Sequence, residues 1–227
     1  MFLNAEQEFT HPNLKMSAVK YLFSPRWISW VCTKNNAAPF SWAMAPFSDP
    51  LQIMMASGGS ASGTDGDTAY CNDTFTAIRD EKQFVVCGVS FEVWEDMHAT
   101  SVPAPRGVHE LKLPELEIPL AKTAKFGIEY DRRCKWYAEC VYTQTVHLLS
   151  DTNGKTNSLV VGKVLAIWVD DSVVVDGRVS MHLLDPVLRT GGNDYIRATT
   201  GQCYRKKRPL WSDGQLAWPD DIYETGP

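Results

Sequence analysis

The sequence predicts a mainly β fold in which a few short helices accompany many strands. Segments rich in Val, Ile, Thr and aromatic residues recur along the chain, and these residue types favour strands. The pairs Asn153-Gly154 and Asp176-Gly177 favour tight hairpin turns. Predicted strands clearly outnumber predicted helices, and no internal repeat is visible. Together these observations are typical of a β-barrel or a β-sandwich.

Two neighbouring strands open the predicted sheet. Residues 26–33 are rich in Trp, Ile, Val and Thr, and residues 34–36 are turn formers. Residues 37–44 form the second strand, which ends in residues 45–50, where prolines and a Ser-Asp-Pro sequence interrupt it. The end of such a strand pair exposes backbone N–H and C=O groups, which suits the binding of a flat polar ring.

Further strands are predicted from apolar or β-prone runs at residues 51–57, 83–89, 126–149 and 158–169, with the third run interrupted near residues 130–133. The segment between the first two of these runs, residues 58–67, contains only small and polar residues and cannot bury itself. We interpret it as a surface insertion, and a lid or edge of a ligand site is the alternative.

Short helices are predicted where apolar residues recur at helical spacing or where capping residues precede them. They cover residues 12–23, 75–82, 91–98 and 181–188. Asn72, Asp73 and Thr74 precede the second of these helices, and Ser180 precedes the last. The start of a helix also offers free N–H groups to a phosphate, although capping alone explains these residue types as well.

The composition is that of an ordinary globular protein, with 44% hydrophobic and 22% charged residues in a chain of 227. The formal net charge of −5 argues against nucleic-acid binding, and the basic run at residues 205–208 is interpreted as a solvated part of the tail. No apolar stretch approaches the length of a membrane span, and the N-terminus lacks the pattern of a signal peptide. Six cysteines without a C-x-x-C pair indicate reduced, mostly buried thiols in a cytoplasmic protein.

Several kinds of active site lack their sequence motif. The chain contains no G-x-G-x-x-G, no P-loop motif and no G-x-S-x-G, so neither a Rossmann site, a phosphate loop nor an α/β-hydrolase nucleophile is predicted. The five histidines are scattered, and no His or Cys spacing predicts a metal site. Adjacent carboxylates at residues 170–171 and 220–221 would point to opposite faces of a strand, so capping or solvation explains them better than acid–base catalysis.

Four motifs occur in order along the chain. The first comprises Pro25-Arg26, Ile28, Trp30-Val31, Thr33, Ala38-Pro39-Phe40-Ser41 and Ser48-Asp49-Pro50. The others are Asn72-Asp73-Thr74, then Val169-Asp170-Asp171 with Asp176-Gly177-Arg178, and finally Arg189-Thr190-Gly191-Gly192 with Tyr195. Together they resemble the flavin reductase-like family of FMN-binding split β-barrel flavoproteins, over roughly residues 12–209. The resemblance implies a split β-barrel with a few short helices.

The resemblance also implies a binding site for FMN, with FAD as the alternative. The flavin ring would lie against Arg26, Met44, Ala45, Phe47 and Ser48. The phosphate would be held by Ser57, Asp73 and Thr74, and the far side would be closed by Gly191, Gly192 and Tyr195. His109 is the candidate catalytic residue, because the matching loop in the family lies near the flavin. The chain departs from the family pattern at Asn72, which lacks the usual positive charge, and at Pro46, which has no N–H to donate.

In function, the resemblance implies an NAD(P)H-dependent flavin oxidoreductase that reduces FMN or FAD and passes electrons to a further acceptor. The alternatives are a flavoprotein electron carrier or flavin-binding module without nicotinamide chemistry, and a barrel without flavin. The family also implies a homodimer with its sites at the interface. Aromatic residues are enriched in interface cores, so four tryptophans in predicted strands favour this assembly as well: Trp30, Trp42, Trp136 and Trp168.

The chain is predicted to comprise an N-terminal lead-in (1–23), a flavin reductase-like split-barrel domain (24–198) and a C-terminal wrapping tail (199–227). The tail is rich in aromatic residues and interrupted by prolines. Prolines prevent a long strand or helix, whereas the aromatic content is untypical of a disordered end. We therefore expect the tail to wrap over a surface and to reach the neighbouring subunit with residues 204–209. A tail that packs only on its own barrel is the alternative.

Overall fold

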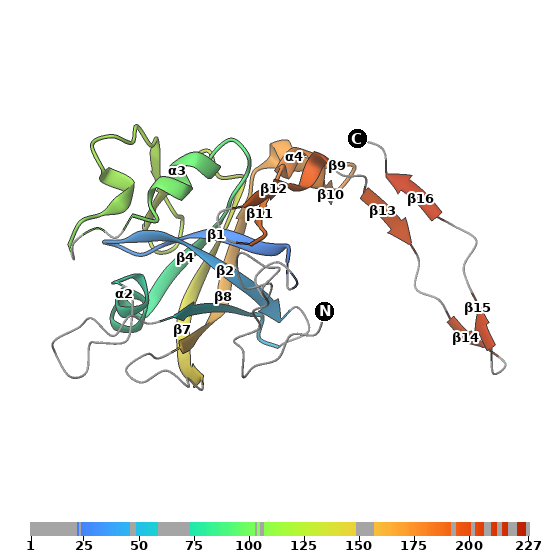
Figure 1. Cartoon of the computed structure of the whole chain (residues 1–227), viewed down its shortest axis with the longest axis horizontal. Helices are drawn as coiled ribbons and strands as arrows, with labels where there is room; N and C mark the ends of the chain where they lie inside the picture. Colours follow the sequence, from blue (N-terminus) through green and yellow to red (C-terminus); the bar gives the residue numbers. More distant parts are fainter. Residues whose placement is uncertain are drawn as a thin grey trace, which may run out of the picture.

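A computed structural model gives the arrangement of the chain (Figure 1). It describes residues 22, 24–45, 49–58, 73–102, 104, 107–148, 157–191, 194–200, 203–206, 210–212, 215–217 and 222–225. The lead-in helix predicted over residues 12–23 lies outside this part of the chain except for the exposed Leu22. The predicted surface insertion and the Asn153-Gly154 turn also lie outside it, apart from Gly58 at the end of a strand.

Six antiparallel strands close into a barrel. They are β1 (Arg26–Cys32), β2 (Ala37–Ala45), β3 (Gln52–Gly58), β4 (Gln83–Gly88), β7 (Trp136–Leu148) and β8 (Asn157–Val169). The strands follow one another in the order β1-β2-β3-β8-β7-β4, and pairing of β4 with β1 closes the ring. The predicted mainly β split-barrel fold is therefore confirmed.

The barrel interior is the first of two hydrophobic cores, and we call it the barrel core. Each of the six strands contributes to it, with Val31 from β1, Phe40 from β2 and Phe84 from β4 among its buried side chains. Helix α2 (Asp73–Glu81) adds Phe75 and Ile78. Phe75 stacks on Phe40 with ring centroids 4.9 Å apart, so α2 is packed into the barrel core.

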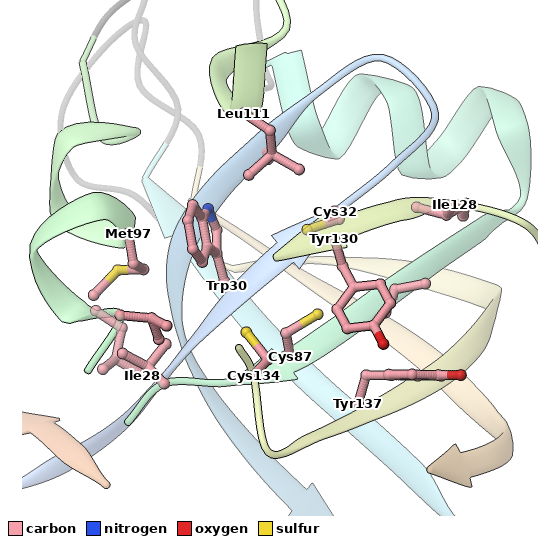
Figure 2. Close-up of a cluster of buried hydrophobic side chains, with 14 of the residues drawn as sticks. Ile28, Trp30, Cys32, Cys87, Met97, Leu111, Ile128, Tyr130, Cys134 and Tyr137 are labelled. Atoms are coloured by element: carbon pink, nitrogen blue, oxygen red, sulfur yellow. The ribbon is translucent and has the colours of Figure 1, made fainter. Parts of the chain in front are cut away.

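The second core, the outer core, lies on the other face of β1 and β4 (Figure 2). Side chains alternate along a strand, so Trp30 and Cys87 point into the outer core while their neighbours Val31 and Val86 point into the barrel core. Helix α3 (Trp94–Ala99), the 3-10 turn η2 (Glu110–Lys112) and the paired strands β5 (Leu120–Lys122) and β6 (Glu129–Asp131) surround this outer core. Burial on both faces explains why residues 84–87 of β4 are all apolar.

Cysteines belong mainly to these cores. Cys32, Cys87 and Cys134 lie in the outer core and Cys140 lies in the barrel core. All four are buried and free, in line with the prediction. Burial raises the pKa of the Cys140 thiol and that of Cys87 above the ordinary value, which keeps these thiols protonated and unreactive.

Helix ends are where the sequence prediction was wrong. The helix predicted over residues 91–98 begins only at Trp94, after a turn, and ends at Ala99. The helix predicted over residues 181–188 is α4 (Met181–Leu184), which Ser180 caps by accepting a hydrogen bond from the Leu183 N–H at 3.3 Å. It ends early because Asp185 adopts a left-handed conformation (φ 46°) and Pro186 follows, which a continuing helix does not tolerate.

The chain after α4 returns to the barrel wall. Strand β11 (Val187–Arg189) pairs with the start of β1, and β12 (Tyr195–Arg197) pairs with β11. Before α4, β9 (Val174–Val175) and β10 (Arg178–Val179) form the predicted hairpin. Its central residues Asp176 and Gly177 both have positive φ angles, 50° and 71°, as a type I′ turn requires.

The described parts of the tail form two short ladders. Strand β13 (Cys203–Lys206) pairs with β16 (Ile222–Thr225), and β14 (Leu210–Ser212) pairs with β15 (Gln215–Ala217). The labelled strands extend away from the barrel, starting on the side of β9 and β10 (Figure 1). The short strands agree with the expectation that prolines prevent a long one, and contact with a second subunit stays a prediction.

Candidate functional site

The predicted site residues fall into two groups at opposite ends of the β1–β2 hairpin. Arg26 begins β1, whereas Asp73 and Thr74 begin α2, which lies beside the turn at residues 33–36 that follows β1. At about 3.3 Å per residue, β1 separates the two ends by roughly 20 Å. We refer to them as the α2 end and the Arg26 end.

At the α2 end, a chain of buried polar side chains links three segments. The Thr74 hydroxyl donates a hydrogen bond to Asn36 Oδ1, and Asn36 Nδ2 donates to Glu110 Oε1 at 3.3 Å. The other carboxylate oxygen, Glu110 Oε2, accepts from the Ala37 N–H at 2.8 Å. All three side chains are at least nine-tenths buried, with 2%, 6% and 7% of Thr74, Asn36 and Glu110 exposed. Burial raises the pKa of Glu110, the hydrogen bond from Ala37 opposes the shift, and the negative charge of Asp73 adds to it.

The same turn also holds the other end of α2. Glu81, the last residue of the helix, accepts hydrogen bonds from the Lys34 N–H at 3.0 Å and from Asn35 Nδ2 at 3.4 Å. The hairpin turn therefore fixes both ends of α2. Because the Thr74 hydroxyl already donates to Asn36, the groups that the helix start offers to a phosphate are its backbone N–H groups.

At the Arg26 end, three strands place their side chains in a row. Arg26 lies opposite Arg189 of β11, and Arg189 lies opposite Tyr195 of β12. Arg26 Nη2 donates to the carbonyl of Thr190 at 3.0 Å, and Arg189 Nη1 donates to the Tyr195 hydroxyl at 3.0 Å. Gly191, which is buried, follows directly. The structure thus brings Arg26, Gly191 and Tyr195 together, although they are far apart in the sequence.

Of the other predicted binding residues, Met44, Ala45 and Ser57 lie on described strands. Met44 and Ala45 end β2 and pair with Ile53 and Gln52, which places their backbone beyond the point where β2 leaves β1. Ser57 lies near the end of β3, opposite Ser158. Three further predicted residues lie outside the described residues: Phe47, Ser48 and Gly192.

His109 is largely buried and uncharged. The side chain is 12% exposed, and Nε2 lies 4.0 Å from Glu129 Oε2. Within the described residues, neither ring nitrogen has a hydrogen-bond partner. Burial lowers the pKa of His109, Lys112 lowers it further, and Glu129 acts in the opposite direction. The ring therefore stays neutral at neutral pH, and it adjoins Glu110 rather than the row at Arg26.

Several neighbours of the predicted residues were not recognised in the sequence. His98 Nδ1 lies 3.1 Å from the Tyr195 hydroxyl, and the ring of Trp94 lies 5.5 Å from that of Tyr195. Trp94 and His98 are four residues apart on α3, a spacing that places them on one helix face and could have indicated a shared contact. No sequence pattern indicated the buried link between Asn36 and Glu110, because it depends on tertiary packing.

The described part of the chain has no group of three or more His, Cys, Asp or Glu side chains placed to hold a metal ion. It also has no helix long and apolar enough to cross a membrane.

Asp170 caps the 3-10 turn η3 (Asp171–Val173), because its carboxylate accepts from the Ser172 N–H at 2.9 Å. The capping interpretation of the adjacent carboxylates is therefore confirmed for Asp170.

Comparison with solved structures supports the fold. Component B of nitrilotriacetate monooxygenase from Bacillus cereus has a TM-score of 0.69 and 19% identity, and the match covers 83% of this chain and 94% of that one. The 2-nitrobenzoate 2-nitroreductase of Pseudomonas fluorescens has a TM-score of 0.66 and 20% identity, with 99% and 96% covered. Both share the architecture of the chain at low sequence identity.

Sequence comparison identifies the family. The model of the flavin reductase like domain matches residues 23–182. An uncharacterized protein of Aquifex aeolicus is 31% identical over 199 residues, which cover 82% of this chain and 90% of that protein. The family match over residues 23–182 contains α2 and the six barrel strands. Strands β11 and β12 of the Arg26 end follow it in the sequence. The chain belongs to the flavin reductase-like family.

Proposed function

We propose that the protein is an NAD(P)H-dependent flavin oxidoreductase that binds FMN, or FAD, along the β1–β2 hairpin. The observation that carries the proposal is the division of the site into two unlike ends on the β1–β2 hairpin. One end is a helix start and the other is a row of Arg26, Arg189 and Tyr195. A flavin nucleotide has a matching form, because a phosphate lies at one end and a polar ring at the other.

The residues at the α2 end suit a phosphate. The N-terminus of α2 presents backbone N–H groups and the positive end of the helix dipole, and Ser57 of β3 is the further proposed contact. The buried chain from Thr74 through Asn36 to Glu110 holds the helix start in place. In this proposal Thr74 therefore acts by positioning the N–H groups.

The residues at the Arg26 end suit the polar edge of a ring. Arg26 is held in place here, because its Nη2 donates to the Thr190 carbonyl at 3.0 Å. Backbone groups at the end of β2, near Met44 and Ala45, add further donors and acceptors. Gly191 and Tyr195 close the far side.

When bound, the flavin supplies the redox chemistry, and the protein supplies position and electrostatics. Arg26 provides positive charge next to the polar edge of the ring. His109 adjoins Glu110 rather than the row at Arg26, so the proposal gives its neutral ring no step at the flavin ring. FMN is preferred to FAD because the two ends account for one phosphate and one ring.

Absorption spectroscopy and a turnover assay test this function together. We expect purified protein to bind FMN with the visible absorbance of oxidised flavin and to oxidise NADH or NADPH when flavin is added. Comparison of the two nicotinamides and of FMN with FAD gives the donor and the cofactor. Flavin binding without nicotinamide oxidation would indicate an electron carrier or flavin-binding module. Absence of flavin binding would contradict the proposal.

We further propose a homodimer with the sites at its interface. Trp30 does not support it as predicted, because it is fully buried within its own chain, whereas Trp168 of β8 is 38% exposed. Support comes instead from apolar side chains on β8 that face solvent, since Leu165 is 40% and Ile167 50% exposed. Light scattering gives the mass in solution, and a monomer that carries stoichiometric flavin would contradict this proposal.

A further inference from the structure

We infer that Asp185 is a positioning residue of the proposed flavin site, because it clamps the base of the hairpin that closes the far side of this site. The hairpin consists of β11, β12 and the connection between them. The inference rests on the proposed function for one point: that Gly191 and Tyr195, near the tip of the hairpin, lie against the flavin. Asp185 belongs to none of the four sequence motifs.

The carboxylate of Asp185 joins the two ends of the hairpin. Arg197, the last residue of β12, donates to it twice, from Nε to Oδ1 at 2.7 Å and from Nη2 to Oδ2 at 2.6 Å. The Thr199 hydroxyl donates to Oδ1 at 2.5 Å. A guanidinium that binds both oxygens of a carboxylate fixes their relative geometry as well as adding energy. The bonds from Arg197 hold the pKa of Asp185 below its ordinary value, so the clamp is charged at neutral pH.

Backbone bonds at Asp185 fix the base of the hairpin to the barrel domain. The Asp185 carbonyl accepts from the Phe91 N–H at 2.9 Å, in the segment between β4 and α3. The Pro186 carbonyl accepts from the Ala198 N–H at 2.9 Å, just beyond β12. The Arg197 guanidinium also lies over the Phe91 ring, with Cζ 4.2 Å from the ring centroid. The start and the end of the hairpin are therefore held at one place.

The backbone conformation of Asp185 is a second sign that this place is constrained. Asp185 has a left-handed conformation, with φ 46° and ψ 52°. Such a conformation is uncommon outside glycine, persists where surrounding contacts hold it, and is enriched at functional sites. It ends α4 and turns the chain toward β11. Asp185 thus sets the direction in which the hairpin begins.

The pairing of β11 with β12 transmits the position of the base to the tip. It extends over only three residues of each strand, from Arg197 to Tyr195 on β12. Among the described residues β12 pairs with no other strand, so its register depends on these pairs and on the clamp. A shift of one residue would turn every side chain to the other face. The clamp therefore fixes where Tyr195 lies, while Arg26 holds the tip through the Thr190 carbonyl.

The variant Asp185→Asn tests the inference. Asparagine keeps the shape of the side chain and tolerates the left-handed conformation, but it lacks the charge that binds Arg197 twice. We expect the variant to weaken binding of FMN and of riboflavin alike, by roughly three- to tenfold, because a charged hydrogen bond is lost at a partly exposed pair. The two flavins should be affected equally because the hairpin closes on the ring, which both contain. Fluorescence titration of the purified protein gives both dissociation constants.

The matched control is Asp176→Asn. Asp176 is also an aspartate with a positive φ angle, 50°, but it is exposed in the turn between β9 and β10. We expect this variant to bind both flavins as tightly as the wild type does. Equal weakening in the two variants would overturn the inference, because the effect would then not depend on the clamp.

A double-mutant cycle distinguishes positioning from a general loss of stability. Arg197→Gln removes the other partner of the clamp, so the double variant should bind flavin about as weakly as the weaker of the two single variants. Amide hydrogen exchange of residues 187–197 should be faster in each variant, with β4 as the reference, and all titrations are made where the variants are folded. Additive effects, or faster exchange with unchanged flavin affinity, would overturn the inference, because Asp185 would then only stabilise the fold.

The variant Arg197→Lys covers the case in which Asp185→Asn does not fold. Lysine keeps the positive charge but lacks the planar fork that binds both carboxylate oxygens, so flavin binding should weaken by roughly two- to fivefold. Unchanged flavin affinity in this folded variant would overturn the inference and leave the proposed function intact. Absence of flavin binding by the wild type would instead contradict the proposed function, and the role of Asp185 with it.

Discussion

At the scale of single residues, Thr74 shows why a position in a motif does not define a role. The family resemblance assigns its hydroxyl to a phosphate, whereas in the structure this hydroxyl donates to Asn36 and the side chain is 2% exposed. Asn36 in turn donates to the buried Glu110. Phosphate contact and the hydrogen bond to Asn36 both concern the start of α2. Two substitutions at Thr74 separate these two roles.

We predict that Thr74→Val lowers the free energy of unfolding by about 1–3 kcal/mol, because Asn36 Oδ1 is left buried without its donor. Thr74→Ser retains the hydroxyl and should recover most of this loss. Urea denaturation measures the stability, and fluorescence titration measures the affinities for FMN and riboflavin. If the hydroxyl also contacts the phosphate, FMN affinity falls far more than riboflavin affinity. A valine variant as stable as the wild type would contradict the buried role.

His109 leads to a prediction about pH. Burial and Lys112 lower the pKa of the folded His109, and Glu129 opposes them, whereas the unfolded residue titrates at about 6.5. As the pH falls, the unfolded chain therefore takes up this proton first. The contribution to stability is fully present above about pH 6.5 and is lost as the pH falls through the folded pKa.

His109→Gln removes that titration, so we predict that the variant loses less stability than the wild type between about pH 7.5 and about pH 5. Urea denaturation at both pH values gives the comparison. His182→Gln is the control, because His182 is exposed on α4. Parallel loss of stability in the wild type and the His109 variant would show that the ring is not held neutral in the folded protein.

The sequence predicted the identity of the site residues better than it predicted the contacts of these residues. Arg26, Gly191 and Tyr195 were named from motif positions, and the pairing of β1, β11 and β12 brings them together. His98, the partner of Tyr195, and Glu110, the partner of Asn36, come from α3 and η2, which pack over the outer core. A motif read along one chain does not contain such contacts, because they arise from tertiary packing.

At the scale of elements, Arg133 connects α3 to the turn that follows β6. Its guanidinium contacts the buried Asp131 at 2.6 Å and Asp96 of α3 at 2.5 Å. The hydrogen bonds that Arg133 donates to Asp131 and Asp96 raise its pKa above the ordinary value. Since α3 carries His98 and Trp94, this ion pair also helps to hold these two side chains next to Tyr195.

We predict that Arg133→Gln lowers the free energy of unfolding by about 3 kcal/mol, because Asp131 is left as a buried charge without its cation. The neighbouring Arg132→Gln should change it by less than about 0.5 kcal/mol, since Arg132 is exposed. Chemical denaturation of both variants gives the comparison. Equal effects at the two positions would mean that the ion pair with Asp131 does not stabilise the fold.

Gly162 marks a close approach inside the barrel. A Cβ at this position in β8 would lie 2.4 Å from Cζ of Phe84, which is fully buried on β4. We predict that Gly162→Ala lowers the free energy of unfolding by about 1–3 kcal/mol through overpacking. Combining it with Phe84→Leu should cost less than the sum of the two single changes, as a double-mutant cycle would measure. Additive effects would contradict the proposed contact.

Strand positions were predicted well and helix ends less well, for physical reasons. Apolar runs such as β4 are unambiguous because both of their faces are buried. The helix near residue 185 ends where Asp185 takes a left-handed conformation and Val187 begins a strand paired to the barrel. That strand pairing competes with helix formation over the same residues, and local sequence does not reveal which prevails.

At the scale of the whole molecule, the barrel and the tail are built differently. The barrel strands are closed into a ring and share a common core. The described strands of the tail, β13 to β16, pair only in twos and extend away from the ring (Figure 1). Two-stranded ladders have marginal stability by themselves in water, so a further surface to cover them would explain their formation. The predicted surface is the neighbouring subunit.

We predict that removing residues 201–227 weakens dimerisation about tenfold or more and lowers the flavin retained per subunit. This truncation keeps Thr199, whose hydroxyl donates to Asp185 at 2.5 Å, so the end of the barrel domain stays intact. Light scattering across a dilution series gives the dissociation constant, in which tenfold corresponds to about 1.4 kcal/mol, and visible absorbance gives the flavin content. The thermal midpoint at high protein concentration is the control for folding. If assembly and flavin content are both unchanged, the tail does not reach the partner site, and the prediction of a wrapping tail is wrong.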